Sequence, residues 1–423
     1  MIRKLFMPDT HSMKQTYIWT ILASLIYAGS SFLMQMVTSK FVGIEQAGVL
    51  SLALTVGNQL MTIGFFNIRA FQISDVTEKY KFSDYCVFRV FTVGAMLLAG
   101  VIWVAQGAYT NEKTAAIAML VLFRGAEAVS DLFEGRYQQK GRYDVACRGV
   151  FAKDCVSLAV FLIVLFLTKN LILSLTALAV VYVAAILFID SHIIGAFGGI
   201  SFSSTWQRQK GLILEGLPLF INAFLNAYII NASKYALENF YGSEMMGLFS
   251  PLYMMAFVVN MFAAFVLKPI VSVLAEKYVK RDIKGFLALI LRQLLVIGIV
   301  TLGCIIGASF LGIPVLNFLY GVDLSKYKAA LYLILISGGF TALYQLLQYG
   351  IIIMRHQYST FVCCGITAII TYFITPFLTK KYAIMGAAAS YSISIGVMSV
   401  LFLVFFVYYL IRDKKKQSEE KHE

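Results

Sequence analysis

About twelve apolar stretches, each close to the length that a bilayer crossing requires, follow one another from Tyr17 to Ile411. A helix needs roughly 20 residues to cross about 30 Å of hydrocarbon. Because lipid offers backbone amides no hydrogen-bond partner, such stretches must cross as helices. The hydrophobic content of 60 % also exceeds the roughly 45–50 % of a soluble domain. The sequence therefore predicts an all-α, polytopic membrane protein.

We expect twelve spans, six in each half of the chain. They are predicted near 16–38, 46–67, 86–108, 114–133, 150–168, 171–191, 213–236, 246–267, 287–311, 329–353, 360–379 and 386–411. This division predicts an N-terminal lobe over 1–205, a C-terminal lobe over 206–411 and a charged tail over 412–423.

The basic residues predict the orientation. Of the 35 Lys and Arg, we assign 26 to connectors on the side of the termini, seven to the opposite loops, and two, Arg124 and Lys234, to span interiors. An excess of basic residues marks the cytoplasmic face, so both termini are expected inside. The net charge of +13 is spread over short connectors and does not indicate nucleic-acid binding. The basic tail after Ile411 is most simply a solvated flank, with contact to anionic lipid headgroups as the alternative.

The two halves of the chain resemble each other. The segment from Phe41 to Ser51 matches the segment from Phe240 to Ser250 at five of eleven positions, including a shared G-x-E-x-x-G. An even number of spans per half means that both halves enter the membrane in the same direction. Such a duplication predicts pseudo-two-fold symmetry about the membrane normal, with a central cavity and a binding site between the lobes.

Polar side chains recur on one face of several expected spans. Gln35 lies on the first span, Asn58 on the second, and Asn222 and Asn226 on the seventh. Any single stripe can be explained by hydrogen bonds between packed helices. Because three spans carry stripes, and two of these correspond in the repeat, we expect these residues to line a water-filled cavity.

Two basic residues fall inside the expected spans. Arg124 is at mid-bilayer depth, where a charge costs a few kcal/mol; it either faces the transport path or forms a self-compensating pair with Glu127. Lys234 has no acid three or four positions before it, although Glu238 follows one turn outward. Both cations could bind a phosphate group, and an arginine could do so through two hydrogen bonds.

Arg69 and Lys268 are expected at the cytoplasmic mouth of the cavity, where snorkelling of a span end is the alternative. Asp190 is interpreted as part of a span end. The six Cys and four His form no metal or redox pattern, and neither a phosphate loop nor a hydrolase motif is present. We therefore expect no catalytic residue, metal site or cofactor. The function that remains is transport, driven by a proton or sodium gradient or by the substrate's own gradient.

Several segments are similar to bacterial polysaccharide repeat-unit flippases of the multidrug/oligosaccharidyl-lipid/polysaccharide exporter (MOP) superfamily. The resemblance covers about residues 15–410 and rests on the order and spacing of short motifs. These are Lys40 to Gly48, Ile63 to Arg69, Gly216 to Leu219, Pro314 to Gly321 and Tyr382 to Ala389.

The resemblance implies that the protein flips undecaprenyl-pyrophosphate-linked oligosaccharide across the bacterial inner membrane by alternating access. It also implies a role in surface polysaccharide synthesis, such as that of O-antigen, alongside other assembly proteins. Arg124 and Lys234 would then bind the pyrophosphate, and the sugars would contact Gln35, Asn58, Asn222 and Asn226. One departure is that the first span has no embedded arginine: Gln35 stands at the repeat position of Lys234.

Four other functions compete with this interpretation. A multidrug/cation antiporter of the same superfamily needs deep acidic residues, whereas we interpret the mid-membrane charge as cationic. A flippase for the peptidoglycan precursor usually has two more spans. A membrane-embedded polysaccharide polymerase or acyltransferase is expected to show a large outer loop with Arg or His, and this chain has none. A structural scaffold would not need Arg124 at mid-bilayer.

Overall fold

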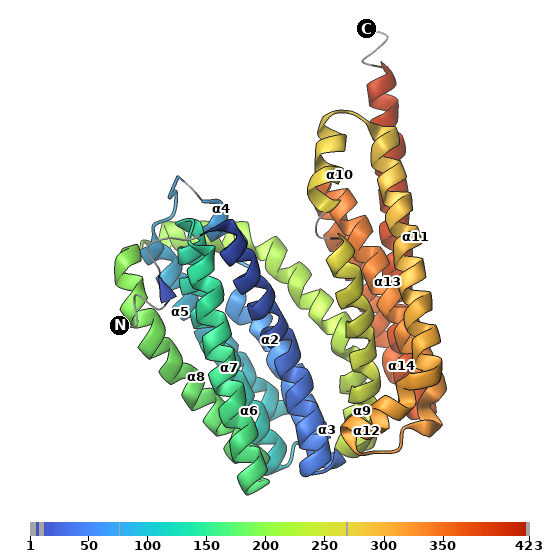
Figure 1. Ribbon diagram of the computed structural model, residues 1–423. Coiled ribbons are helices and arrows are strands. Elements are labelled where there is room, and N and C mark those ends of the chain that lie inside the picture. Colours follow the sequence, from blue (N-terminus) through green and yellow to red (C-terminus); the bar gives the residue numbers. More distant parts are fainter. Residues whose placement is uncertain (1–5, 8–11, 76, 268–269, 420–423) are drawn as a thin grey trace. The chain divides into compact units, whose positions relative to one another are not determined.

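A computed structural model describes residues 6–7, 12–75, 77–267 and 270–419, and within these ranges the chain forms helices and no strand (Figure 1). The α-helices are α2 (Met13–Phe41), α3 (Ile44–Phe65), α4 (Arg69–Ser74), α5 (Phe82–Gln106), α6 (Asn111–Gln139), α7 (Tyr143–Thr168), α8 (Leu171–Ile194), α9 (Trp206–Leu267), α10 (Ile270–Val279), α11 (Ile283–Gly307), α12 (Ile313–Tyr320), α13 (Lys328–Ile353) and α14 (Tyr358–Glu419).

Two of these elements are each a pair of helices joined at a sharp bend. The backbone of α9 is non-helical at Gly242 (φ 78°, ψ −173°), and that of α14 at Ala383 (φ 46°, ψ −127°). Both helices of each pair match predicted spans, so α9 and α14 supply four of the twelve.

Hydropathy alone finds fewer than twelve spans, because α9 and α14 are each counted once and the charged helix α6 is left out. Among the described residues, nine segments are long and apolar enough to cross a membrane, and α6 is not one of them. Its 29 residues are long enough, but several ionisable side chains lower its hydropathy. Counting α6, and both helices of α9 and α14, gives the twelve predicted spans. The fold class is confirmed, and the chain is a multi-pass membrane protein.

The repeated glycine of the two halves has a structural reason. Gly43 precedes α3 with φ 128°, and its repeat partner Gly242 has φ 78° at the bend of α9. Side chains disfavour positive φ, so glycine is the residue that such a turn between two spans prefers. The sequence match therefore coincides with the same kind of reversal in both halves.

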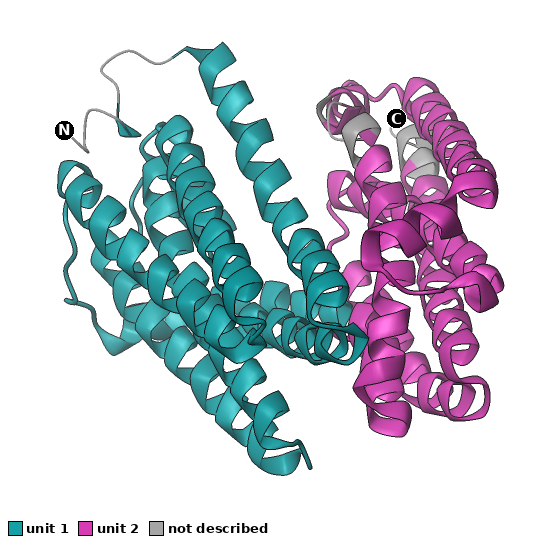
Figure 2. Cartoon of the chain, turned by 60° about the horizontal axis from the view of Figure 1, so that its bottom comes forward, with its two compact units in different colours: residues 1–227 teal, residues 228–423 magenta. Residues whose placement is uncertain are grey.

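The chain divides into two compact units, residues 1–227 and 228–423 (Figure 2). The predicted lobe boundary lay between 205 and 206, whereas the structure divides the chain within α9. The first turns of α9 pack on unit 1: Gln59 Nε2 donates to the carbonyl oxygen of Phe224 at 3.1 Å, and the rings of Phe66 and Phe220 stack at 4.7 Å. The first helix of α9 is therefore divided: its residues up to 227 belong to unit 1, and the rest of it belongs to unit 2.

Candidate functional site

The first part of the site is a band of charge on α6. Arg124, Glu127, Asp131 and Glu134 recur at intervals of three or four residues, so they share one face of this helix. All four side chains are buried. Partners for them come from α4, α5 and α7.

Arg69 binds two of these acids from α4. Its guanidinium contacts Asp131 at 2.8 Å and Glu134 at 2.9 Å, and it also donates to Gln138 at 3.3 Å. Arg89 on α5 contacts the second oxygen of Asp131 at 2.9 Å. Arg69 was predicted to lie at the cytoplasmic mouth, with snorkelling as the alternative. In the structure two buried carboxylates hold its guanidinium, and its location at the mouth stays a prediction.

A second ion-pair cluster forms around Lys153 on α7, whose side chain is fully buried. The ammonium group contacts Asp190 on α8 at 2.9 Å and Glu134 at 3.6 Å, and it donates a hydrogen bond to Ser130. Tyr137 donates to the other oxygen of Asp190 at 3.0 Å. Asp190 lies near the end of α8, as the interpretation of a span end predicted, but the sequence did not indicate its ion pair with Lys153.

The charge count in the sequence missed this cluster because it assigned Arg89 and Lys153 to the flanking connectors. Both lie on helices and are almost completely buried. A signal for the Lys153 pair was present, since Lys153 and Asp190 lie at similar distances from the tight turn at Lys169 and Asn170. An antiparallel hairpin brings such positions to within about one helical turn of each other.

Arg124 is paired on its own helix. Its guanidinium contacts Glu127 at 2.5 Å, as the simpler interpretation predicted, and the side chains of both residues are buried. The Nε atom has no hydrogen-bond partner among the described residues. The expectation of a net cationic interior is wrong for unit 1, because buried acids pair with its buried Arg89, Arg124 and Lys153.

Residues of α2, α3, α4, α6, α7 and α8 line a partly open cavity of about 300 Å³ within unit 1. Its polar lining includes Arg69, together with an acidic wall made of Glu127, Asp131, Glu134 and Asp154. Asp154 on α7 is 7 % exposed, and its Oδ2 atom has no hydrogen-bond partner in the described structure. The cavity therefore combines compensated charges with one unpaired carboxylate.

Charge pairing also holds the connector between α8 and α9. Arg136 on α6 donates to the carbonyl oxygen of Phe197 at 3.0 Å and contacts Glu78 at 2.8 Å. Hydrogen bonds from Lys140 and Arg136 lower the pKa of the Glu78 carboxyl. A lowered pKa stabilises the fold above the ordinary pKa, and this contribution disappears as the pH falls through the lowered value.

The predicted sugar-binding residues do not line this cavity. Gln35 on α2 is buried, and its Oε1 atom has no partner among the described residues. Asn58 on α3, and Asn222 and Asn226 on the first helix of α9, are half-buried. The Oδ1 atom of Asn222 is likewise buried without a hydrogen-bond partner in the described part of the chain. The sugar-binding role of these four residues stays a prediction.

In unit 2 the notable group is Lys234 on α9. Its ammonium group lies 3.8 Å from the ring centroid of Tyr253, a cation–π contact. Tyr253 is held by a 3.1 Å hydrogen bond from its hydroxyl to the carbonyl oxygen of Ile230, and its ring lies 5.1 Å from that of Tyr391.

No ion pair with Lys234 occurs among the described residues. Glu238, the acid one turn outward, instead accepts a 3.1 Å hydrogen bond from Ser243. Lys268, the other basic residue predicted for the mouth, lies outside the described residues. Lys234 is therefore a cation within a span that an aromatic face, and no carboxylate, stabilises.

Comparisons with known proteins agree with this architecture. No family model matches the chain. Its sequence is 21 % identical over 401 residues to the capsular polysaccharide biosynthesis protein CapF of Staphylococcus aureus, covering 93 % of this chain and 99 % of that protein. The structure matches an inward-facing multidrug resistance transporter of the MATE family with a TM-score of 0.74 at 12 % identity, covering 95 % of this chain and 99 % of that chain. The chain shares the fold of this MOP superfamily transporter.

A second MOP structure is similar as well. The lipid II flippase MurJ, in an inward closed conformation, matches with a TM-score of 0.69 at 13 % identity, covering 92 % of this chain and 89 % of that chain. The resemblance that the short motifs indicated is thus confirmed. At 12 % and 13 % identity, both structures show what fold this chain has.

The ion-pair network predicts a difference between two buried aspartates. Asp190→Asn would leave Lys153 short of a partner, and breaking a buried pair costs about 3–5 kcal/mol. Asp154→Asn removes a carboxylate that has no ion-pair partner, so it should not destabilise the protein. We expect a lower thermal unfolding temperature in detergent for Asp190→Asn alone. Equal stability of the two variants would contradict the network.

Proposed function

We propose that this protein flips an undecaprenyl-pyrophosphate-linked oligosaccharide across the bacterial inner membrane during surface polysaccharide synthesis. The observation that carries the proposal is Lys234, a cation inside a span with no carboxylate partner in the described structure. A pyrophosphate headgroup supplies the negative charge that such a group attracts, most strongly where little water competes. The similarity to a capsular polysaccharide biosynthesis protein supports this class of substrate.

The contacts of Lys234 suit a reversible anion site. The Tyr253 face stabilises the ammonium group without neutralising it, since a ring contributes only about 0.5–2 kcal/mol. The hydrogen bond to Ile230 and the packing against Tyr391 fix the ring in place. An arriving phosphate therefore needs to displace no carboxylate. Arg124 could join only by giving up its pair with Glu127, so Lys234 is the main phosphate contact in this proposal.

The alternative of a multidrug/cation antiporter has one observation in its favour. The cavity of unit 1 has an acidic wall, which would suit a cationic ligand. However, Arg69 already pairs with two of these acids and Arg124 with a third. A cationic ligand would therefore have to compete with these guanidinium groups for the carboxylates. For this reason we favour the anionic substrate.

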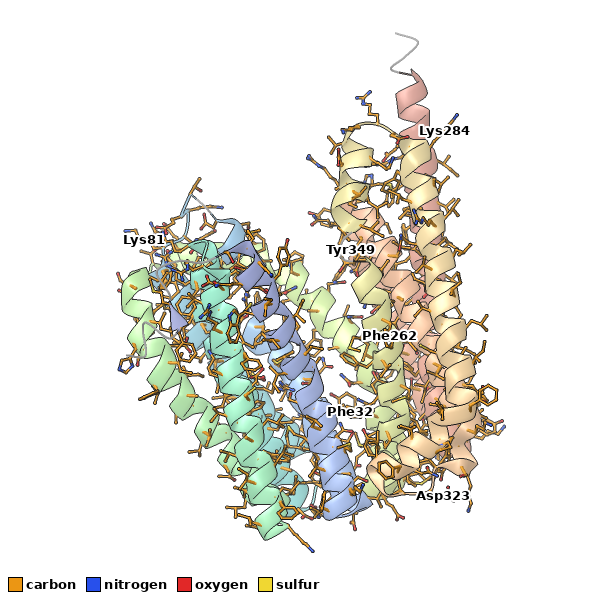
Figure 3. The ribbon with its side chains drawn as sticks, viewed as in Figure 1. Phe32, Lys81, Phe262, Lys284, Asp323 and Tyr349 are labelled. Atoms are coloured by element: carbon orange, nitrogen blue, oxygen red, sulfur yellow. The ribbon has the colours of Figure 1, made fainter. Side chains whose placement is uncertain are left out.

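The orientation proposed here places both termini in the cytoplasm. Lys284 and Asp323 lie at opposite ends of unit 2 (Figure 3). In a functional variant without native cysteines, a cysteine in place of Asp323 should react with a membrane-impermeant maleimide in intact spheroplasts. A cysteine in place of Lys284 should react only after lysis. The reverse labelling pattern would overturn the orientation.

We expect Lys234→Met to reduce surface polysaccharide, because the apolar side chain keeps its length and loses its charge. A charge-assisted hydrogen bond contributes about 1.5–3 kcal/mol, so the loss should be about tenfold or more in substrate affinity. Lys234→Arg should retain part of the activity. The measurement is the surface polymer of a deletion strain that carries each variant at equal membrane abundance.

Lys328→Met is the matched control, because Lys328 also lies over a tyrosine ring, that of Tyr332, at 6.0 Å. It should leave the surface polymer unchanged. Normal polymer in Lys234→Met would remove Lys234 from the mechanism. Unchanged polymer in the deletion strain, together with increased sensitivity to cationic dyes, would favour the antiporter instead.

A further inference from the structure

A second cavity of unit 1 has a volume of about 610 Å³ and lies among connecting segments. Its lining comes from the loop between α4 and α5, the first turn of α5, Arg136 near the end of α6, and residues between 198 and 208, which lead from α8 into α9. We call it the connector cavity; Lys81, one of its lining residues, is labelled in Figure 3. It shares none of its described lining residues with the 300 Å³ cavity, so the two are separate sites.

Arg136 presents one free donor group to the connector cavity. Its side chain is 9 % exposed, its Nε atom donates to Phe197, and its Nη1 atom donates to Glu78 and Gln139. The Nη2 atom makes no hydrogen bond to the described residues. It lies beside Gly198, another lining residue, where an added Cβ atom would stand 3.4 Å from Nη2. Glycine at this position, with φ 108°, therefore leaves this edge of the guanidinium uncovered.

Asp84 is the buried acid of the lining, and both of its carboxylate oxygens are engaged. Oδ2 accepts from Arg208 at 2.8 Å and from the backbone N–H of Lys81 at 2.8 Å. Oδ1 accepts from the hydroxyl of Ser204 at 2.6 Å. This acid therefore holds the loop, the first turn of α5 and the start of α9 together, and it is already supplied with donors.

The charges that line the connector cavity sum to a positive value. The lining contains three basic residues and two acidic ones, which are Lys81, Arg136, Arg208, Glu78 and Asp84. Arg208 offsets Asp84, and Glu78 has two cationic partners, Arg136 and Lys140. No ion pair of Lys81 occurs among the described residues. The carboxylates thus have cations of their own, and the groups that are left for a ligand are donors.

Two helices begin at this cavity. Helix α5 starts at Phe82 and α9 at Trp206, and residues of both first turns belong to the lining. The N-terminus of a helix carries partial positive charge and free amide protons, which suit a phosphate. The first turn of α9 contains no acid, and the hydroxyl-bearing residues Ser203 and Thr205 come directly before it. The cavity therefore combines cationic, hydroxyl and helix N-terminal donors.

Apolar side chains alternate with the lining residues along the connector to α9. Ser201 and Ser203 line the cavity, whereas Ile200, Phe202 and Trp206 have exposed side chains. Aromatic side chains, tryptophan above all, favour the boundary between lipid headgroups and hydrocarbon. A lipid with its phosphate in the cavity would therefore find apolar side chains beside the site for its acyl chains.

We propose that the connector cavity binds a phosphate group, and that the source of this group is the headgroup of an anionic membrane lipid. Arg136 Nη2, the ammonium group of Lys81 and the hydroxyls before α9 are its donors, while Arg208 stays with Asp84. A bound phosphate joins the α4–α5 loop to the connector, since both segments contribute donors. This site is distinct from the one proposed for the transported substrate, because it belongs to unit 1 and Lys234 belongs to unit 2.

Native mass spectrometry of the purified full-length protein tests the site. The protein is titrated with phosphatidylglycerol and with phosphatidylcholine that carries the same acyl chains. We expect the wild type to bind the anionic lipid more tightly. Lys81→Met should weaken this binding about fivefold, because a lysine near anionic headgroups contributes a comparable attraction. Lys81→Arg should restore it. Lys81 is exposed, so its replacement leaves the buried contacts of Asp84 intact.

Lys210→Met is the matched control, because Lys210 is an exposed lysine on α9 that does not line the cavity. It should leave the preference for phosphatidylglycerol unchanged. Equal losses in Lys81→Met and Lys210→Met would indicate attraction to the general surface charge and would overturn the proposal. Equal binding of the two lipids by the wild type would overturn the lipid headgroup as the source.

A third arm of the experiment uses inorganic phosphate in place of lipid. We expect it to compete with phosphatidylglycerol for the wild type and to compete less well for Lys81→Met. Binding of inorganic phosphate that depends on Lys81, without a preference for the anionic lipid, would support the phosphate site and assign its occupant to the solution. A wild type that binds inorganic phosphate no better than Lys81→Met and does not prefer phosphatidylglycerol would contradict the site altogether.

Discussion

Compensation of buried charge is the constraint on which the rest of this structure depends. A membrane domain has no water with which to solvate an ion, so each buried charge must find a partner or become neutral. In unit 1, α6 presents a face of ionisable side chains, and α4, α5 and α7 supply counter-charges to it, while Asp190 on α8 pairs with Lys153 on α7. The position of these helices around α6 is thus tied to electrostatics as well as to apolar packing.

The two units meet this constraint differently. Unit 1 pairs its cations with carboxylates, whereas in unit 2 an aromatic face covers Lys234. An ion pair has little attraction left for a ligand, whereas a lysine over an aromatic ring has no carboxylate that offsets its charge. We therefore propose that the attraction for an anionic headgroup lies in unit 2.

The sequence predicted the features that depend on local pattern. Helix length and hydropathy indicated twelve spans, and the repeat identified Gly43 and Gly242, whose positive φ values explain their recurrence. The Arg124–Glu127 pair was also visible, because its members are three residues apart. The Lys153–Asp190 pair was missed. Its members lie on different helices, and the tight turn between these helices only indicates that the two residues are near each other, not that their side chains meet. Assigning each lysine to a connector or a span does not show whether its side chain is buried among the helices.

The claim that unit 2 holds an uncompensated cation for a pyrophosphate is tested most directly by equilibrium binding. Native mass spectrometry of the purified protein would compare undecaprenyl pyrophosphate with undecaprenyl monophosphate, for the wild type and for Lys234→Met. The account predicts that the wild type prefers the pyrophosphate and that the substitution removes this preference. An equal preference in both proteins would contradict it.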